Sequence, residues 1–413
     1  MFFRKPKKVA LALAGGGARG AYHIGVWRAL RELGVRFDIV TGTSVGALTG
    51  AIIAQGDYET AAETFGNIKN SDVMELPDNL DELGGFVKFV AKNGGVDTTP
   101  LAELLERCVS EQKVRSSGVD FGLVIVRRSD MYPIEATLDT IPEGELLKYM
   151  LASASIFPFF ASPDIDGEKY IDGGMFNNLP VGLADDMGAD EVIAVDLEAL
   201  GVEKAYNGGL PVRFIRPSWP LGSIIDFDAA TARRNMQLGY LDCLKAYREL
   251  DGVKYAVNKG DYAKAAAGTL VEDATALIQL LPPLTARAIF GDLAHDYDAH
   301  RGPRRMLMAL AECAAEVMEL DPLIVYSLEQ LDRAILAAYH ESTPLAISIS
   351  AKSITADVNR RSAAVSMVRA MESGKNSVEL TVLGMARHTA CAGAAYICAL
   401  LAREKALETG ADA

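Results

Sequence analysis

Ser44 has the surroundings that most clearly favour chemistry. It lies at the centre of Gly42-Thr43-Ser44-Val45-Gly46, after the mostly apolar run 37–40 and before a helical pattern of small residues. A sharp strand-to-helix turn lifts a serine hydroxyl clear of the sheet, and only glycine leaves room two residues to either side. The first N–H groups of the following helix also point there with partial positive charge. The pattern predicts a nucleophile, although a serine that only caps the helix has the same local sequence.

A glycine-rich turn precedes this motif. Gly15-Gly16-Gly17-Ala18-Arg19-Gly20 joins a predicted strand to a predicted helix, and consecutive glycines expose backbone N–H groups that bind an anion. The turn fits an oxyanion hole. It also fits a dinucleotide phosphate cradle, for which Gly15, Gly17 and Gly20 have the right spacing and Asp38 lies near the expected acidic position. The serine motif that follows favours the oxyanion hole, because a nucleotide site does not require it.

Arg19 and Val45 have predicted roles beside this turn. Arg19 either fixes the glycine turn by hydrogen bonds or is a solvated or sheet-packed side chain. Val45 follows the serine, so its N–H is a further candidate donor to an oxyanion.

Asp172 is the candidate base. It ends a strand-like run and is followed by Gly173 and Gly174, which let the loop fold back towards the glycine-rich turn. A carboxylate at a desolvated strand end can have its pKa raised enough to take a serine proton directly. The alternative is an ordinary turn aspartate. Four histidines lie in the C-terminal portion, and His23, in an otherwise apolar helix, favours a packed, hydrogen-bonded residue over a triad member.

Composition excludes several classes of function. Half of the 413 residues are hydrophobic and 23% are charged, which is ordinary for a soluble globular protein. The net charge of −14 argues against nucleic acid as a partner and against broad adhesion to anionic membranes. Five cysteines show no metal-ligand spacing, and their odd number fits no complete disulfide framework. We therefore expect no metal, no cofactor and a reducing, cytoplasmic setting.

Two segments bear on membranes. The basic start, 1–8, lacks a signal-peptide pattern, so no secretion is inferred; it is either frayed or makes transient contact with a membrane surface. The longest apolar stretch, 390–402, is shorter than the ~20 residues that cross a bilayer, and it predicts a buried helix.

The order of elements predicts an α/β fold. The first 200 residues or so alternate short apolar runs, at 9–13, 37–40, 122–126 and 192–195, with helical patterns, which is typical of a three-layer α/β/α arrangement with a mainly parallel sheet. We divide the chain into a basic tail (1–8), a catalytic domain (9–215), a connecting helical segment (216–250) and a mostly helical accessory domain (251–413). Helical patterns cover 18–33, 229–250, 304–320, 327–340, 355–372 and 388–407, with strand-like runs at 345–349 and 378–382.

Two further segments lie beside the predicted site in sequence. The polar stretch 71–99, in which paired glycines bracket Phe86–Val90, is either a hinged cover or a helix packed on the sheet. The aromatic run 156–160, which follows Ser153 and Ser155, lines an acyl pocket or belongs to the core.

The motifs resemble those of the patatin-like phospholipase family. The matching blocks are Gly15–Gly20, Gly42–Gly46, Ser153–Pro158 and Asp172–Gly174, in the family's order, and the resemblance covers roughly residues 7–200. It implies that Ser44 and Asp172 form a catalytic dyad and that Gly15, Gly16 and Gly17 supply the oxyanion hole. It further implies hydrolysis of carboxylic esters of lipids or lysolipids. The alternatives are a lipid-binding or regulatory protein of this fold without turnover and, less favoured, a nucleotide-binding enzyme.

Overall fold

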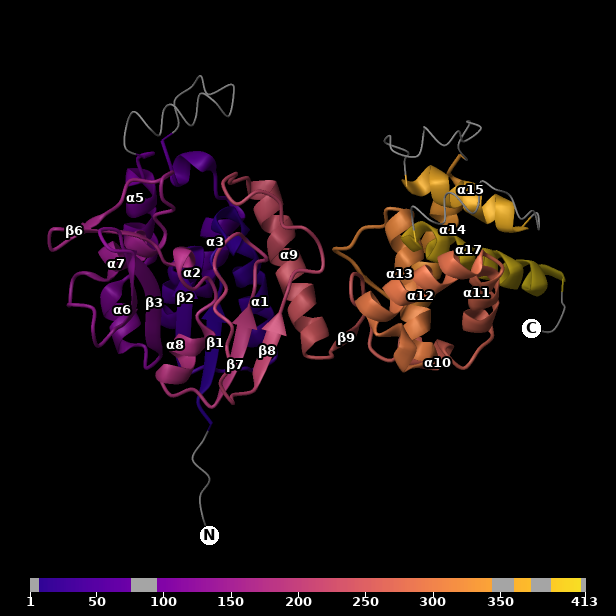
Figure 1. The fold of residues 1–413 in the computed structure, drawn as a ribbon, viewed down its shortest axis with the longest axis horizontal. Coiled ribbons are helices and arrows are strands. Elements are labelled where there is room, and N and C mark those ends of the chain that lie inside the picture. Colours follow the sequence, from indigo (N-terminus) through magenta and orange to yellow (C-terminus); the bar gives the residue numbers. More distant parts are fainter. Residues whose placement is uncertain (1–6, 76–94, 344–359, 373–387, 410–413) are drawn as a thin grey trace, which may run out of the picture. The chain divides into compact units, whose positions relative to one another are not determined.

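The computed structural model describes residues 7–75, 95–343, 360–372 and 388–409 (Figure 1). Two compact units make up the chain, Met1–Ala246 and Tyr247–Ala413. The segment 86–90, residues 1–6 of the basic tail and the strand-like runs 345–349 and 378–382 lie outside the described residues.

An eight-stranded sheet forms the centre of the first unit. It follows the path β5-β6-β3-β2-β1-β7-β8, with β4 pairing to β3 in addition. The pairs β1–β2, β2–β3, β1–β7 and β7–β8 are parallel, whereas β4, β5 and β6 add antiparallel pairs. The strands are β1 (Val9–Leu13), β2 (Ile39–Thr43), β3 (Asp120–Arg127), β4 (Tyr132–Thr137), β5 (Asp164–Ile165), β6 (Glu168–Asp172), β7 (Glu191–Val195) and β8 (Val212–Ile215).

Helices cover both faces of this sheet (Figure 1). Phe121 and Gly122 are neighbours on β3, so they face opposite sides of the sheet. A Cβ at Gly50 of α2 would touch Phe121, whereas one at Gly122 would touch Leu183 of α8. Helices α2 and α8 therefore lie on opposite faces, which confirms the three-layer α/β/α fold. The helical elements are η1 (Gly17–Gly20), α1 (Ala21–Glu32), α2 (Val45–Gln55), α3 (Tyr58–Gly66), η2 (Asn70–Asp72), α5 (Thr99–Cys108), α6 (Glu111–Ser116), α7 (Leu146–Ser153), η3 (Gly173–Met175), α8 (Val181–Asp186) and α9 (Ala229–Ala246).

Helix α9 packs along α1, although it lies in the segment 216–250 that we expected to connect two domains (Figure 1). Two glycines allow the close approach. A Cβ at Gly25 would lie 1.8 Å from the Met236 carbonyl oxygen, and one at Gly239 would lie 2.2 Å from that of Tyr22. Larger residues at either position would force the two helices apart.

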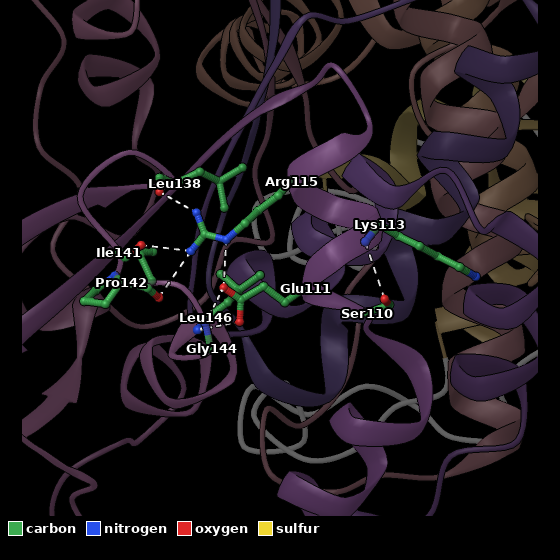
Figure 2. Close-up of polar contacts among 9 residues, drawn as sticks. All are labelled: Ser110, Glu111, Lys113, Arg115, Leu138, Ile141, Pro142, Gly144 and Leu146. Carbon is green, nitrogen blue, oxygen red and sulfur yellow. Dashed lines mark hydrogen bonds and ion pairs between the residues drawn. The ribbon is translucent and has the colours of Figure 1, made fainter.

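A half-buried ion pair anchors the loop between β4 and α7 (Figure 2). Arg115 and Glu111 of α6 form it, with Nε and Oε1 2.7 Å apart. The guanidinium also donates to the carbonyl oxygens of Leu138, Ile141 and Pro142, at 2.7–3.2 Å. The Glu111 carboxylate accepts from the N–H groups of 144 and 146, at the entrance to α7. The start of α7 is therefore held at α6.

The second unit consists of helices and a three-stranded sheet. The sheet contains β9 (Leu250–Asp251), β10 (Ala256–Asn258) and β11 (Val325–Tyr326). The helices are α10 (Asp261–Ala265), α11 (Leu270–Gln279), α12 (Pro283–Tyr297), η4 (Ala299–Arg301), α13 (Pro303–Val317), α14 (Leu328–His340), α15 (Arg360–Glu372) and α17 (His388–Thr409). The side chains of Ser327 and Gln330 form a capping box at the start of α14.

Helix α17 is the centre of this unit and packs against α11, α13 and α15. Its residues 390–401 are all buried, as expected from the apolar stretch there. Within the described residues, no helix has the length and apolar character needed to cross a membrane.

Candidate active site

Two strands that meet along one edge of β3 bring Ser44 and Asp172 together. Strand β4 pairs with residues 122–127 of β3, some of which also pair with β2 and the others with β6. Strand β4 therefore occupies one edge of β3, and β2 and β6 share the other. Strand β2 runs parallel to β3 and ends at Thr43, opposite Val124. Strand β6 runs antiparallel to β3 and ends at Asp172, opposite Ile125. The chain therefore leaves β2 at Ser44 next to the place where β6 ends.

Ser44 has a strained backbone. Its φ of 56° and ψ of −129° lie in a region that L residues rarely adopt. Such a conformation costs on the order of 1–3 kcal/mol and persists only where neighbours enforce it. The two flanking glycines permit this turn, because a Cβ at Gly42 would lie 2.2 Å from the Gly46 carbonyl oxygen, and one at Gly46 would lie 2.3 Å from that of Leu13.

Ser153 holds the backbone of this turn from the end of α7. Its Oγ accepts the Ser44 N–H at 2.9 Å and donates to the Val124 carbonyl at 2.7 Å. All three residues are buried, so each of these hydrogen bonds satisfies a group that has no access to water. The serine turn is therefore attached to β3 through the Val124 carbonyl, and to α6 because Glu111 holds the start of α7.

Asp172 is nearly fully buried, with 6% of its surface exposed. Its Oδ1 accepts the Gly174 N–H at 2.7 Å. Burial raises the pKa of this carboxyl from 3.8 to about 6, while the Ser44 hydroxyl and the Gly174 N–H oppose that rise. Within the described residues Oδ2 forms no hydrogen bond of ordinary geometry, although the Ser44 hydroxyl is close enough to affect the pKa. Catalytic hydrogen bonds are often long or poorly aligned before a substrate binds.

The glycine-rich turn follows β1 at the same end of the sheet. The Gly15 N–H donates to the Asn178 carbonyl at 3.0 Å, so Gly15 is not available as an oxyanion donor. Its part is steric, because a Cβ there would lie 3.0 Å from the Ser44 Cβ. The N–H groups of Gly16, Gly17 and Val45 form no hydrogen bond within the described part of the chain. These three groups are the candidate donors.

Arg19 fixes the turn through carbonyl groups. Its guanidinium donates to the carbonyl oxygens of Gly222, Leu197 and Glu198, at 2.9, 3.1 and 2.6 Å. Of the two roles considered for Arg19, the structure therefore shows the hydrogen-bonding one. The turn is thereby tied to two segments that lie far from it in the sequence.

An apolar cavity extends from Ser44. It encloses about 680 Å³ of empty space, including its open mouth. Ile156 and Phe160 line it, whereas Phe157 and Phe159 of the same aromatic run are partly exposed. The lining comes from α2, α3, α5, the glycine-rich and serine turns, and the segments 68–73, 154–160 and 224–227: Gly17, Ser44, Val45, Leu48, Ile52, Thr64, Phe65, Ile68, Val73, Leu101, Leu104, Leu105, Cys108, Ala154, Ile156, Phe160, Ile224, Ile225 and Phe227. A cavity with this lining suits a hydrocarbon chain.

His23 is a packed histidine, as expected. Its Nδ1 lies 3.0 Å from the Thr49 hydroxyl, and burial lowers the pKa of the ring to about 3. The ring is neutral at physiological pH, and its hydrogen-bond partner is Thr49.

The nucleotide interpretation does not fit the position of Asp38. Its carboxylate accepts the Val9 N–H at 3.0 Å, at the amino end of β1, whereas the glycine-rich turn follows the carboxyl end of that strand. Asp38 therefore lies at the wrong end of the sheet to contact a ribose bound there. In the described parts of the chain, no group of three or more His, Cys, Asp or Glu residues could hold a metal. All five cysteines are free and buried, and the reducing setting stays a prediction.

Asn178 is a site residue that sequence reasoning missed. Its backbone carbonyl accepts from the Gly15 N–H, its side chain donates to the Gly15 carbonyl at 3.3 Å, and its own N–H donates to Val202. It thereby joins the glycine-rich turn to the segment after Asp172. The sequence shows an asparagine six residues after the candidate base, but its burial appears only in the fold.

Comparison with known proteins identifies the first unit. Residues 11–185 match the family model described as patatin-like phospholipase. The chain carries a patatin-like phospholipase domain. The matched range of this patatin-like domain contains the glycine-rich turn, Ser44 and Asp172. It ends before β7 and before the Arg19 acceptors at 197, 198 and 222.

Several curated relatives match part of the chain. Patatin-like phospholipase domain-containing protein ZK370.4 of Caenorhabditis elegans is 29% identical over 258 residues, which cover 60% of this chain and 18% of the relative. Patatin-like phospholipase domain-containing protein 6 of Homo sapiens is 29% identical over 192 residues (46% and 13%). Lysophospholipase NTE1 of Coccidioides immitis is 29% identical over 199 residues (47% and 12%). The matches thus span less than a fifth of each relative.

Two solved structures align with most of the chain. VipD from Legionella pneumophila aligns over 92% of this chain and 90% of its own, with 12% identity and a TM-score of 0.38. The type III effector ExoU aligns over 92% and 77%, with 14% identity and a TM-score of 0.30.

Proposed function

We propose that this protein is a serine hydrolase that cleaves carboxylic ester bonds of lipids through a Ser44–Asp172 dyad. The observation that supports this most strongly is the position of Ser44. It lies next to a buried carboxyl group of raised pKa and lines an apolar cavity. The match to patatin-like phospholipases and the lysophospholipase named among the relatives support a lipid substrate.

The proposed reaction has two steps. The Ser44 Oγ attacks the acyl carbonyl carbon while Asp172 takes its proton, and the N–H groups of Gly16, Gly17 and Val45 stabilise the oxyanion. The oxyanion collapses to an acyl-enzyme as the alcohol leaves with the proton from Asp172. Water then attacks the acyl-enzyme, Asp172 takes a proton from that water, and the proton returns to Ser44 as the fatty acid is released.

The substrate is a phospholipid or lysophospholipid that lies in a membrane or micelle. The cavity is apolar, so it would receive the acyl chain while the polar headgroup stays outside. The protein would therefore contact a membrane surface only transiently, while it takes up a substrate that lies there.

A fluorophosphonate probe tests the chemistry independently of the natural substrate. We expect covalent labelling at Ser44, identified by mass spectrometry, together with hydrolysis of short-chain p-nitrophenyl esters. Ser44→Ala should abolish both. Asp172→Asn should keep the fold and lose at least about 100-fold in turnover, because the serine proton then has no acceptor.

The main competing function is a lipid-binding protein without turnover. Folded protein that binds lipid but neither reacts with the probe nor hydrolyses any ester would establish that function instead. Near-normal turnover in Asp172→Asn would show that another group acts as the base.

A further inference from the structure

The cavity beside Ser44 has a direction, which helix α2 defines. Val45, Leu48 and Ile52 all line it, and they lie on one face of α2, which begins directly after Ser44. With a rise of about 1.5 Å per residue, Ile52 lies ~12 Å along the helix from Ser44, and Gln55 lies ~16 Å along it. The cavity therefore follows the helix away from the nucleophile.

Helix α5 forms a second wall with the same direction. It begins shortly after Val96, whose N–H donates to the Phe159 carbonyl. Phe159 belongs to the segment that follows Ser153, and the Ser153 hydroxyl contacts the Ser44 N–H. Leu101, Leu105 and Cys108 line the cavity at successive turns of α5. At its other end the Cys108 carbonyl accepts from the Gln55 side chain at 2.7 Å. Both helices thus run from the serine end to the Gln55–Cys108 end.

Polar contacts close the far end. The Gln55 amide donates to Cys108 and accepts from the Ser110 N–H at 3.0 Å, so it bridges the ends of α2 and α5. The Cys108 Sγ lies 3.3 Å from the Thr64 hydroxyl of α3. A hydrocarbon chain that extended further would have to break these contacts.

We infer that α2 and α5 act as a ruler for the acyl chain, with Ile52, Leu105 and Cys108 setting the preferred length. This inference rests on the proposed function. A zigzag chain with C–C bonds of about 1.5 Å advances ~1.25 Å per bond, so about 10 bonds reach Ile52 and about 13 reach the Gln55–Cys108 end. The preferred substrates are esters of acyl chains with about 12 to 14 carbons.

The test is the chain-length profile of p-nitrophenyl esters from 4 to 18 carbons, kept below their critical micelle concentrations where they form micelles. Each buried methylene contributes about fourfold in kcat/KM, so the profile should rise steeply and then fall once the cavity is full. The rates at which alkyl fluorophosphonates of the same lengths label Ser44 give a second profile, which does not depend on deacylation.

Two variants should move the profile in opposite directions. Ile52→Phe narrows the cavity two turns from Ser44, and it should lower the ratio of kcat/KM for 12-carbon over 4-carbon esters at least tenfold. Leu105→Ala opens the wall of α5, and it should move the optimum to longer chains. Ile53→Ala is the matched control. Ile53 is buried but does not line the cavity, so this variant should lower the melting temperature and leave the profile unchanged.

The outcomes separate the ruler from the proposed function. Absence of hydrolysis and of labelling at every chain length overturns the proposed function. Normal hydrolysis of 4-carbon esters with a flat profile, or with the same profile in Ile52→Phe and Leu105→Ala, overturns the ruler alone. A changed profile in Ile53→Ala would also overturn it, because altered stability would then explain all three variants.

Discussion

Acidification should switch off ester hydrolysis by protonating Asp172. Burial raises the pKa of this carboxyl to about 6, and only the ionised form can accept the Ser44 proton. With this pKa, about 90% of the molecules are ionised at pH 7 and about 10% at pH 5, so kcat/KM should fall about tenfold between these values. With the ordinary pKa of 3.8, the two rates would differ by less than about 10%.

The assay is the hydrolysis of p-nitrophenyl butyrate from pH 5 to pH 8. Absorbance is followed at a wavelength at which nitrophenol and nitrophenolate absorb equally, and circular dichroism at each pH shows whether the fold persists. His23 makes no contribution in this range, because its pKa is about 3. A flat profile from folded protein would refute the assignment of Asp172 as a buried base. An inflection near 6 that survives in Asp172→Asn would refute it as well.

Three further variants test the dyad and its surroundings. Asp172→Asn should stabilise the protein above pH 6 by up to about 3 kcal/mol, because the folded state binds the Asp172 proton more tightly than the unfolded chain; thermal melts should show this gain fading as the pH falls to 4. Ser153→Ala should cost about 1–3 kcal/mol in urea unfolding and lower kcat, because the Ser44 N–H and the Val124 carbonyl lose their partner. Arg19→Met should lower kcat for butyrate esters about tenfold through a loosened oxyanion turn, whereas unchanged kcat would show that the three carbonyl contacts are dispensable.

Parts of this architecture were predictable because their signals are local. The run 9–13 is apolar throughout and becomes β1 with the same bounds, and Ser327 and Gln330 form the capping box that their spacing indicates. Strand β2 was placed at 37–40, but it spans Ile39–Thr43. The prediction stopped too early because a glycine, here Gly42, normally indicates a break in a strand. A glycine is required at this position because the backbone of Gly46 approaches it closely.

Other parts depend on contacts between distant segments and carry no local signal. The two-residue strands β5, β9 and β11 exist only through their pairing partners. Glycine runs expose N–H groups in general, yet the Gly15 N–H is occupied by Asn178, 163 residues away in the chain. The sequence could therefore indicate the chemistry of the candidate site without indicating which donors are available.

The contacts of the glycine-rich turn also set the smallest unit that can be active. Gly222 accepts from Arg19, and the Ile224 carbonyl accepts the Ala18 N–H at 2.9 Å, so the turn depends on a segment beyond the predicted catalytic domain of 9–215. Helix α9 follows directly and packs on α1. We therefore expect a protein ending at Ala246 to hydrolyse p-nitrophenyl butyrate, and one ending at Arg216 to fail.

The loss of activity in the protein ending at Arg216 should have two separable causes. Loss of α9 exposes the apolar face of α1 and should reduce expression of folded protein, which circular dichroism and size-exclusion chromatography measure. Loss of the segment containing Gly222 and Ile224 should impair the oxyanion turn even where the fold survives. The full-length variant Arg19→Met tests the second cause with α9 present, because it removes the side-chain donor to the Gly222 carbonyl. Full activity of the protein ending at Arg216 would show that the glycine-rich turn holds its conformation without this segment.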